Sequence, residues 1–202
     1  MARTLLYFAH PGQRQSHANW AMAQAARPID GVTFVDLYAD YPRYNIDIDR
    51  EQARLRAHSV IVFQFPLFWY SPPALVKEWL DLVLEPGFAY GEGGTALVGK
   101  TLMLAITAAS PAEAYGPDGF QKFPIRDFLR PLEQTAALCQ MRFTPPYLLF
   151  GALDAQTHGS IPPHVAGYRA LLTALRDDRY DFDAAAGHDV ITCDALPLRA
   201  EG

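Results

Sequence analysis

The sequence has few cysteines, and they do not form a recognisable pair. Cys139 and Cys193 are the only two, far apart and without a CxxC or Cys/His ligand spacing. This indicates neither a zinc site nor a disulfide framework, and we interpret both as reduced thiols. Asp154, His158 and His164 also lack metal-ligand spacing, so we interpret them as solvated loop residues and expect no metal.

Long apolar runs and an excess of basic residues are absent as well. The apolar run at residues 5–9 is too short for a signal-peptide core or a membrane span, so we expect a cytoplasmic protein. A net charge of −5 gives no general attraction to nucleic acid. With 50% hydrophobic residues the chain can bury a sizeable core. We predict one domain, residues 1–180, and a tail, residues 181–202.

Two glycine-containing signatures are missing. There is no GxSxG nucleophile elbow, which argues against a hydrolase of that type. The first loop holds the single Gly12 and no GxGxxG, so the dinucleotide fingerprint is absent.

Apolar, β-branched segments alternate with helical patterns along the chain. We predict strands at residues 4–9, 32–37, 59–65, 101–107 and 142–150. We predict helices at residues 18–26, 49–58, 74–84, 125–140 and 161–177, with Asp49 capping the second. Pro145-Pro146 interrupts the last strand, which favours a sheet edge. The tail is either a strap or disordered.

This alternation predicts an α/β fold, a doubly wound parallel sheet in a three-layer αβα arrangement. A flavodoxin-like strand order, 2-1-3-4-5, and a Rossmann order are the candidates. The missing fingerprint favours the flavodoxin-like order.

Three successive strand ends, near residues 10, 66 and 107, carry irregular loops that the topology places along one rim. Gln15, Ser16, His17 and Asn19 lie where the first helix begins, a position that favours a phosphate. Ser16 acting only as a helix cap is almost as good an interpretation. His10 either orients a phosphate or satisfies its own loop.

The loop at residues 63–73 is aromatic and stiffened by proline. Trp69 and Tyr70, beside Pro66 and Pro72-Pro73, can form a wall for a flat ring. Packing under a neighbouring loop is the alternative for one such loop alone. The coincidence of three loops on one rim favours a ligand site.

A joint pattern of short motifs spans roughly residues 4–150. It comprises Tyr7-Phe8-Ala9-His10-Pro11, Ser16-His17-Ala18-Asn19, Leu37-Tyr38, Asn45-Ile46-Asp47-Ile48, Gln64-Phe65-Pro66-Leu67, Trp69-Tyr70, Lys77, Trp79, Ala89-Tyr90-Gly91, Gly93-Gly94-Thr95-Ala96-Leu97, Gly99-Lys100, Pro131-Leu132 and Thr135-Ala136. This pattern resembles flavodoxin-like NAD(P)H:quinone oxidoreductases, most closely the ancillary quinone reductases of glutathione-gated potassium efflux systems.

The resemblance implies a bound flavin, with FMN favoured and FAD the alternative, and NAD(P)H as co-substrate. The matched cofactor-binding residues are His10, Gln15, Ser16, His17, Asn19, Pro66, Leu67, Phe68, Trp69, Tyr70, Thr107, Ala108, Ala109 and Ser110. Tyr115 is the implied hydrogen-bond donor to a reduced flavin or a quinone oxygen. Tyr90 matches an aromatic residue that reaches the substrate pocket from the other subunit, which implies a homodimer.

The implied reaction is a two-step hydride transfer from NAD(P)H, through the flavin, to a quinone-like acceptor. Two alternatives stay open. One is a flavin-bearing regulatory subunit of a potassium efflux transporter, peripheral at the inner face of the membrane. The other is a reductase of azo or nitro compounds with the same fold.

Two loops depart from the family pattern. Residues 107–111 carry alanines and a proline where relatives have glycines that let the backbone approach the ring. Residues 115–124 lack a histidine that some relatives place near the quinone, so solvent is the expected proton source. Phe68 replaces a frequent glutamine. We expect substrate preference to differ at these positions.

Overall fold

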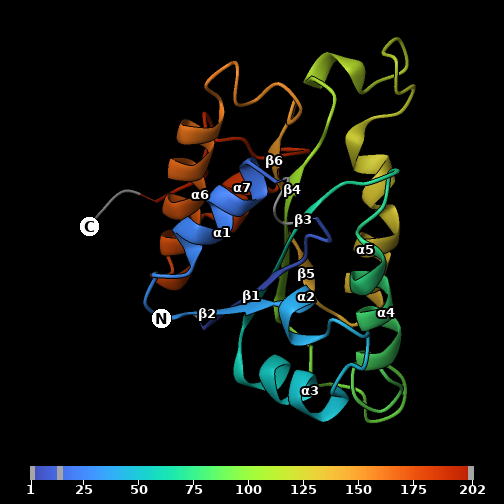
Figure 1. The fold of residues 1–202 in the computed structure, drawn as a ribbon. Helices are drawn as coiled ribbons and strands as arrows, with labels where there is room; N and C mark the ends of the chain where they lie inside the picture. The colour runs from blue at the N-terminus through green and yellow to red at the C-terminus, as the bar shows by residue number, and fades with distance from the viewer. Residues whose placement is uncertain (1–2, 13–15, 200–202) are drawn as a thin grey trace.

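A parallel sheet lies between two layers of helices in the computed structural model, which describes residues 3–12 and 16–199 (Figure 1). The strands are β1 (Thr4–Phe8), β2 (Val32–Asp36), β3 (Val60–Pro66), β4 (Thr101–Thr107), β5 (Arg142–Phe143) and β6 (Tyr147–Leu149). Their order is β2-β1-β3-β4-β5, and β6 also pairs with β4. The predicted flavodoxin-like order is confirmed.

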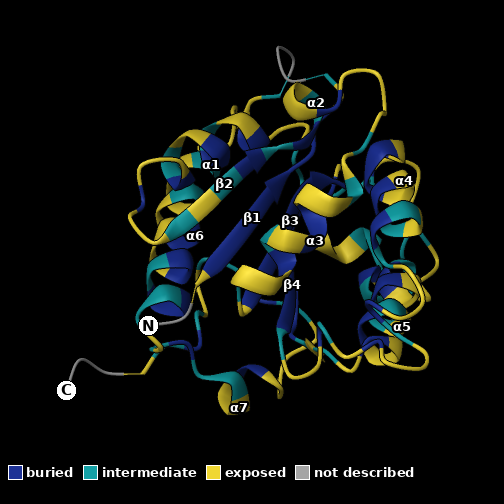
Figure 2. Ribbon diagram, turned by 90° about the horizontal axis from the view of Figure 1, so that it is seen from below, coloured by how far each residue is buried: buried dark blue, intermediate teal, exposed yellow. Residues whose placement is uncertain are grey.

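Every residue of β1, β3 and β4 is buried, because helices cover both faces of the sheet (Figure 2). This explains why these strands read as continuous apolar runs without alternation. The parallel register sets Phe8 beside Gln64 and Pro66 beside Thr107. The carboxyl ends of the three central strands therefore meet at one edge.

The helices divide between the two faces. Helices α1 (Ala18–Ala26), α6 (Ile161–Arg176) and α7 (Phe182–Ala185) lie on one side, and α3 (Ile48–Ala57), α4 (Ala74–Val83) and α5 (Arg130–Leu138) on the other (Figure 1). Each face has its own apolar core, the first including Met22 and Leu171, the second Phe63 and Trp79.

Two helix starts differ from the sequence prediction. The Asp36 side chain accepts a hydrogen bond from the Ala39 backbone, which begins the short α2 (Leu37–Asp40) at the end of the strand predicted at residues 32–37, where no helix was predicted. The predicted Asp49 cap of α3 is wrong. Asp47 caps this helix by accepting from the Arg50 N–H at 3.0 Å, so the helix begins at Ile48.

Proline explains two further differences. The predicted helix at residues 125–140 consists of a 3₁₀ segment, Ile125–Leu129, followed by α5, whose first turn holds Pro131. Proline has no N–H and fits a helix start better than an interior. The predicted strand at residues 142–150 is two short strands, because Pro145 and Pro146 separate β5 from β6.

The tail packs along the sheet as a strap up to residue 199. Ile191 donates to the Pro146 carbonyl at 2.8 Å and accepts from the Leu148 N–H at 2.9 Å, so it covers the free edge of β6. Tyr180 and Ala185 are buried against the core. In the described part of the chain, no helix is long and apolar enough to cross a membrane.

The interpretation of His164 as a solvated loop residue is wrong. Its side chain is 1% exposed within α6 and stacks on Tyr147 with ring centroids 4.4 Å apart. The helical pattern of residues 161–177 turns this position toward the sheet.

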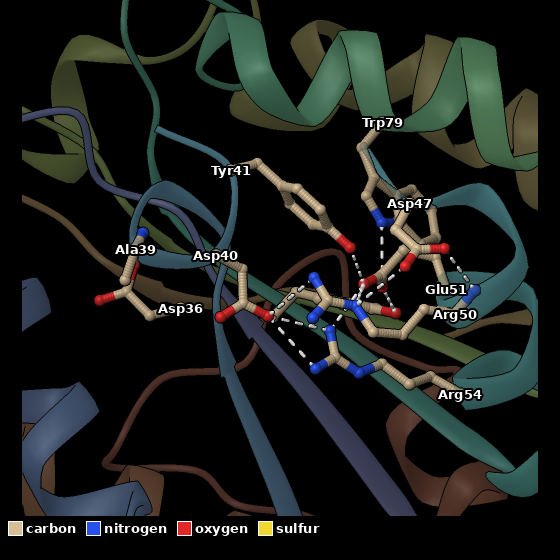
Figure 3. Close-up of polar contacts among 10 residues, drawn as sticks. Asp36, Ala39, Asp40, Tyr41, Asp47, Arg50, Glu51, Arg54 and Trp79 are labelled. Carbon is tan, nitrogen blue, oxygen red and sulfur yellow. Dashed lines mark hydrogen bonds and ion pairs between the residues drawn. The ribbon is translucent and has the colours of Figure 1, made fainter. Parts of the chain in front are cut away.

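A buried carboxylate connects α3 to the sheet and to α4 (Figure 3). Glu51 is fully buried and accepts hydrogen bonds from the Tyr7 and Tyr41 hydroxyls, from Trp79 Nε1 at 3.2 Å and from Arg54 at 2.6 Å. Burial, and then the adjacent Glu51 charge, hold the pKa of Tyr7 well above its usual value. The phenol therefore stays a donor, which the carboxylate needs.

Candidate functional site

A pocket of about 350 Å³ opens at the carboxyl ends of β1, β3 and β4. It is lined by His10, Gly12, Ser16, His17, Ala18, Asn19, Pro66, Leu67, Phe68, Thr107, Ala109, Ala152 and Leu153. The three predicted loops thus converge on one cavity. Among residues 3–12 and 16–199, no Lys, Arg, Asp or Glu lines it, and the described lining contributes neutral polar groups and the start of α1.

The first loop places neutral polar groups beside the start of α1. His10 is 7% exposed, and burial lowers its pKa. Its Nδ1 accepts from the Gly12 N–H at 3.1 Å, so the proton of the neutral ring lies on Nε2. Ser16 Oγ accepts from the Trp20 N–H at 3.3 Å, as a cap would. Gln15, predicted for this loop, lies outside the described residues.

The second loop turns sharply at its two aromatic residues. Phe68 and Ser71 exchange two backbone hydrogen bonds of 3.0 Å, and Trp69 and Tyr70 between them have φ of 47° and 64°. Positive φ at both central residues is the geometry of a type I′ turn, which usually carries Asn-Gly. Bulky side chains rarely adopt it, and such strain tends to gather at functional sites.

The two turn residues do not line the pocket. Trp69 is 91% exposed, and Tyr70 stacks on Phe128 with ring centroids 4.8 Å apart. Phe68 does line the pocket. Its ring meets the His10 ring edge-on, with the ring centroids 5.7 Å apart. The loop therefore contributes Pro66, Leu67 and Phe68 to the wall.

Within the third loop, Thr107 and Ala109 line the pocket, whereas Ala108 and Ser110 hold the loop in place. Ala108 exchanges backbone hydrogen bonds with Leu149 and Ala152, at 2.8 and 2.9 Å. Ser110 Oγ accepts from Gln121 Nε2 at 2.9 Å. Both residues tie the loop to its neighbours.

Tyr115 lies outside the pocket, in an aromatic cluster with Phe128 and Phe150. It is half-buried, and burial raises the pKa of its hydroxyl. The group therefore keeps its proton and can donate a hydrogen bond.

Sequence reasoning missed a fourth segment of the pocket. Ala152 and Leu153 follow β6, and the backbone contact between Ala108 and Ala152 brings them to the rim. The signal was present, because the strand predicted at residues 142–150 also ends at this edge of a parallel sheet.

Tyr90 lies in a separate groove of about 500 Å³ between α4 and α5. The groove is lined by Ser71, Pro72, Lys77, Leu80, Asp81, Leu84, Tyr90, Phe128, Pro131, Leu132, Thr135, Leu138 and Cys139. A Cβ added at Gly94 would lie 2.0 Å from the Tyr90 carbonyl oxygen, so a glycine is required to hold this loop. The groove meets the aromatic turn at Ser71 and Phe128.

Comparisons with known proteins agree with this architecture. A family model described as having a flavodoxin-like fold matches residues 2–172. The glutathione-regulated potassium-efflux system ancillary protein KefG of Cronobacter sakazakii is 50% identical over 171 residues, 85% of this chain and 92% of that protein.

Two solved structures are similar over most of their length. General stress protein 14 of Treponema denticola, in complex with FMN, has 36% identity and a TM-score of 0.81, covering 86% of this chain and 99% of that one. An NADPH-quinone reductase from P. pentosaceus has 28% identity and a TM-score of 0.70, covering 83% and 95%. The chain belongs to the flavodoxin-like fold family, as its motifs predicted.

Proposed function

We propose that this protein is a flavin-dependent oxidoreductase that passes hydride from NAD(P)H to a quinone-like acceptor. The observation that carries the proposal is the pocket, where the start of α1 meets a wall of proline, aliphatic and aromatic side chains. The NADPH-quinone reductase and the FMN-bound stress protein among similar structures support this reaction class.

The residues present fit a flavin mononucleotide. Ser16 and His17, at the start of α1, would hold a phosphate with a hydroxyl, an imidazole and the helix dipole. Pro66 to Phe68 and Ala109 would flank the ring. Bound FMN would accept and release the hydride. The FMN-bound relative favours FMN over FAD, the alternative.

Side chains around the pocket would orient the acceptor. The exposed indole of Trp69, next to the lining residue Phe68, offers a flat surface on which an aromatic acceptor can stack. Tyr115 would donate a hydrogen bond to a reduced oxygen, since its raised pKa keeps it protonated. Such stacking selects flat molecules, so azo and nitro compounds are alternative acceptors.

A homodimer with shared sites is part of the proposal. The groove between α4 and α5 has a partly apolar lining, and Leu138 on its rim is 55% exposed. A second copy docked there would cover this surface and bring Tyr90 of the partner subunit toward the aromatic turn. Ser71 and Phe128 connect groove and turn.

A specific observation also favours a second function. KefG, an ancillary protein of a potassium-efflux system, is 50% identical over 92% of its length. This supports a regulatory subunit of such a transporter, cytoplasmic and peripheral at the inner face of the membrane.

The visible spectrum of the purified protein tests the cofactor, followed by release and identification of the flavin. We expect bound FMN and NAD(P)H-dependent quinone reduction. Ala109→Trp, which fills the pocket, should abolish both, whereas Ala170→Trp on the exposed side of α6 should not. A colourless wild-type protein that takes up no added flavin would contradict the proposal.

Two assays separate the enzyme from the regulatory subunit. Quinone turnover by the isolated protein supports the enzyme. Altered transport by a co-expressed efflux system, without turnover, supports the subunit. Relative rates with quinones, azo compounds and nitro compounds identify the acceptor class.

A further inference from the structure

Three buried polar side chains form a hydrogen-bonded chain beside the pocket. Gln64 on β3 is fully buried, and Asn19 at the start of α1 is 2% exposed. Gln64 Nε2 donates to the Asn19 backbone carbonyl at 2.8 Å, and Asn19 Nδ2 donates to Thr107 Oγ1 at 2.7 Å. Asn19 and Thr107 both line the pocket.

Hydrogen-bond donation along Gln64, Asn19 and Thr107 has only one consistent direction. The Asn19 carbonyl can only accept, so it fixes the amide of Gln64 with its nitrogen facing Asn19. Gln64 Nε2 also lies 3.4 Å from Asn19 Oδ1, which places the oxygen of Asn19 toward Gln64 and its nitrogen toward Thr107. Thr107 Oγ1 therefore accepts, and the hydrogen of its own hydroxyl is left for another acceptor.

The backbone carbonyl of Thr107 already has a hydrogen-bond partner of its own. Its carbonyl accepts from the Leu67 N–H at 2.9 Å, which ties the second loop to the third. The hydroxyl hydrogen is thus a donor of Thr107 that the described chain leaves for the pocket.

Keeping an amide at position 64 costs stability. Gln64 Oε1 is buried and has no hydrogen-bond partner among residues 3–12 and 16–199. An unpaired buried oxygen is unfavourable, and an apolar side chain would suit the middle of a buried strand better. Gln64 orients the side-chain amide of Asn19, and this role accounts for a glutamine at position 64.

We infer that Asn19 and Gln64 are positioning residues that make the Thr107 hydroxyl a hydrogen-bond donor toward an acceptor atom of the flavin. The inference rests on the proposed function and changes the expected part of Asn19, which acts through Thr107. Thr107 is then the residue that touches the ligand.

Asn19→Asp tests the direction of the chain, because a carboxylate has the same shape but can only accept. Thr107 would then donate to the carboxylate, away from the flavin. We expect Asn19→Asp and Thr107→Val each to weaken FMN binding by about three- to tenfold, the effect of one hydrogen bond. Quenching of FMN fluorescence by the apoprotein measures this affinity. Thr107→Ser, which keeps the hydroxyl, should bind FMN within about twofold of wild type.

The double variant separates positioning from charge. If Asn19 acts through Thr107, adding Asn19→Asp to Thr107→Val should weaken FMN binding by less than about twofold. Repulsion between the new carboxylate and the FMN phosphate would persist in the Thr107→Val background, and fully additive losses would overturn the inference.

Thermal unfolding of the apoproteins distinguishes a purely structural role. Such a role predicts coupling between the two substitutions in melting temperature and none in FMN affinity, which would also overturn the inference. A wild-type protein that binds no flavin would overturn the proposed function and this inference together. Flavin binding with additive losses would overturn the inference alone.

Discussion

Trp69 and Tyr70 show how one pair of residues relates strain to function. Both occupy left-handed backbone conformations between the hydrogen-bonded Phe68 and Ser71. Each such conformation costs about 1 kcal/mol or more for a bulky side chain. Stacking on Phe128 offsets part of this conformational free-energy cost for Tyr70, whereas Trp69 projects into solvent. The indole therefore contributes little to folding and is available to a substrate.

Replacing Trp69 by Asn should stabilise the protein by about 1 kcal/mol, because Asn tolerates positive φ and the exposed indole loses no packing. The KM for a quinone should rise with the loss of stacking. Urea unfolding and steady-state kinetics measure the two effects. Tyr70→Asn is the matched control and should give a smaller gain, since it removes the Phe128 contact. Equal stabilities of wild type and Trp69→Asn would contradict the strain argument.

At the scale of elements, Glu51 attaches α3 to its neighbours. One carboxylate accepts a hydrogen bond from α4 through Trp79 (Figure 3). It accepts another from β1 through Tyr7. A buried charge is tolerable only when its oxygens are fully hydrogen-bonded, and here they are. The network adds to the packing of Leu55 in holding α3, which suits a helix with few buried apolar residues.

Glu51→Ala should lower the free energy of unfolding by about 3 kcal/mol or more, because it leaves buried donors of Tyr7, Tyr41 and Trp79 without an acceptor. Denaturant unfolding measures the loss. Asp40→Ala removes a partly exposed carboxylate from the same cluster, paired with Arg54, and should cost under about 1 kcal/mol. Similar losses for both variants would rule out the buried network as the cause.

The contact of α6 with β6 contains a titratable group that affects acid stability. Burial lowers the pKa of His164 to about 4, so the folded protein resists the proton that the unfolded chain takes up near pH 6.5. Stability is therefore present above pH 6.5 and falls as pH drops toward 4, by about 3 kcal/mol.

His164→Phe should keep the stacking on Tyr147 and flatten this dependence. Urea unfolding at several pH values between 7 and 4 measures it. Asp177 and Asp181, whose pKa values are lowered by Arg176 and by α7 backbone N–H groups, add acid sensitivity in both proteins, so the difference isolates His164. Parallel curves would mean that His164 contributes nothing.

At the scale of the whole molecule, the groove between α4 and α5 is the surface that the proposed homodimer uses. It continues into the aromatic turn through Phe128, which contacts both Tyr70 and Tyr115. Docking of a second copy would therefore constrain the loops at the mouth of the pocket. Assembly and activity should change together.

Leu138→Glu should convert the proposed homodimer to a monomer, because it places a charge on the rim of the groove. If the sites are shared, quinone turnover should fall at least tenfold. Removing one well-packed interface residue weakens association by about this factor or more. Sedimentation velocity gives the oligomeric state. Ala170→Glu, on the exposed side of α6, adds the same charge elsewhere and should remain dimeric. A monomeric wild-type protein with full activity would contradict shared sites.

The sequence alone determined the strand order, the layers and the three loops that meet at the pocket. Continuous apolar strands and helical periodicity are local patterns, and the handedness of parallel crossovers turns them into one topology. His10 and Pro66 follow predicted strands, Thr107 ends one, and Ser16 precedes a predicted helix, so their convergence could be expected.

Tertiary structure decided what each side chain does there. Whether Asn19 faces a ligand or Thr107, and whether Trp69 covers the pocket or projects into solvent, depends on contacts with residues far along the chain. The burial of His164 and the strap at Ile191 likewise arise from packing against β6. Local patterns fix backbone direction, whereas hydrogen-bond direction and exposure require neighbours that only the folded chain provides.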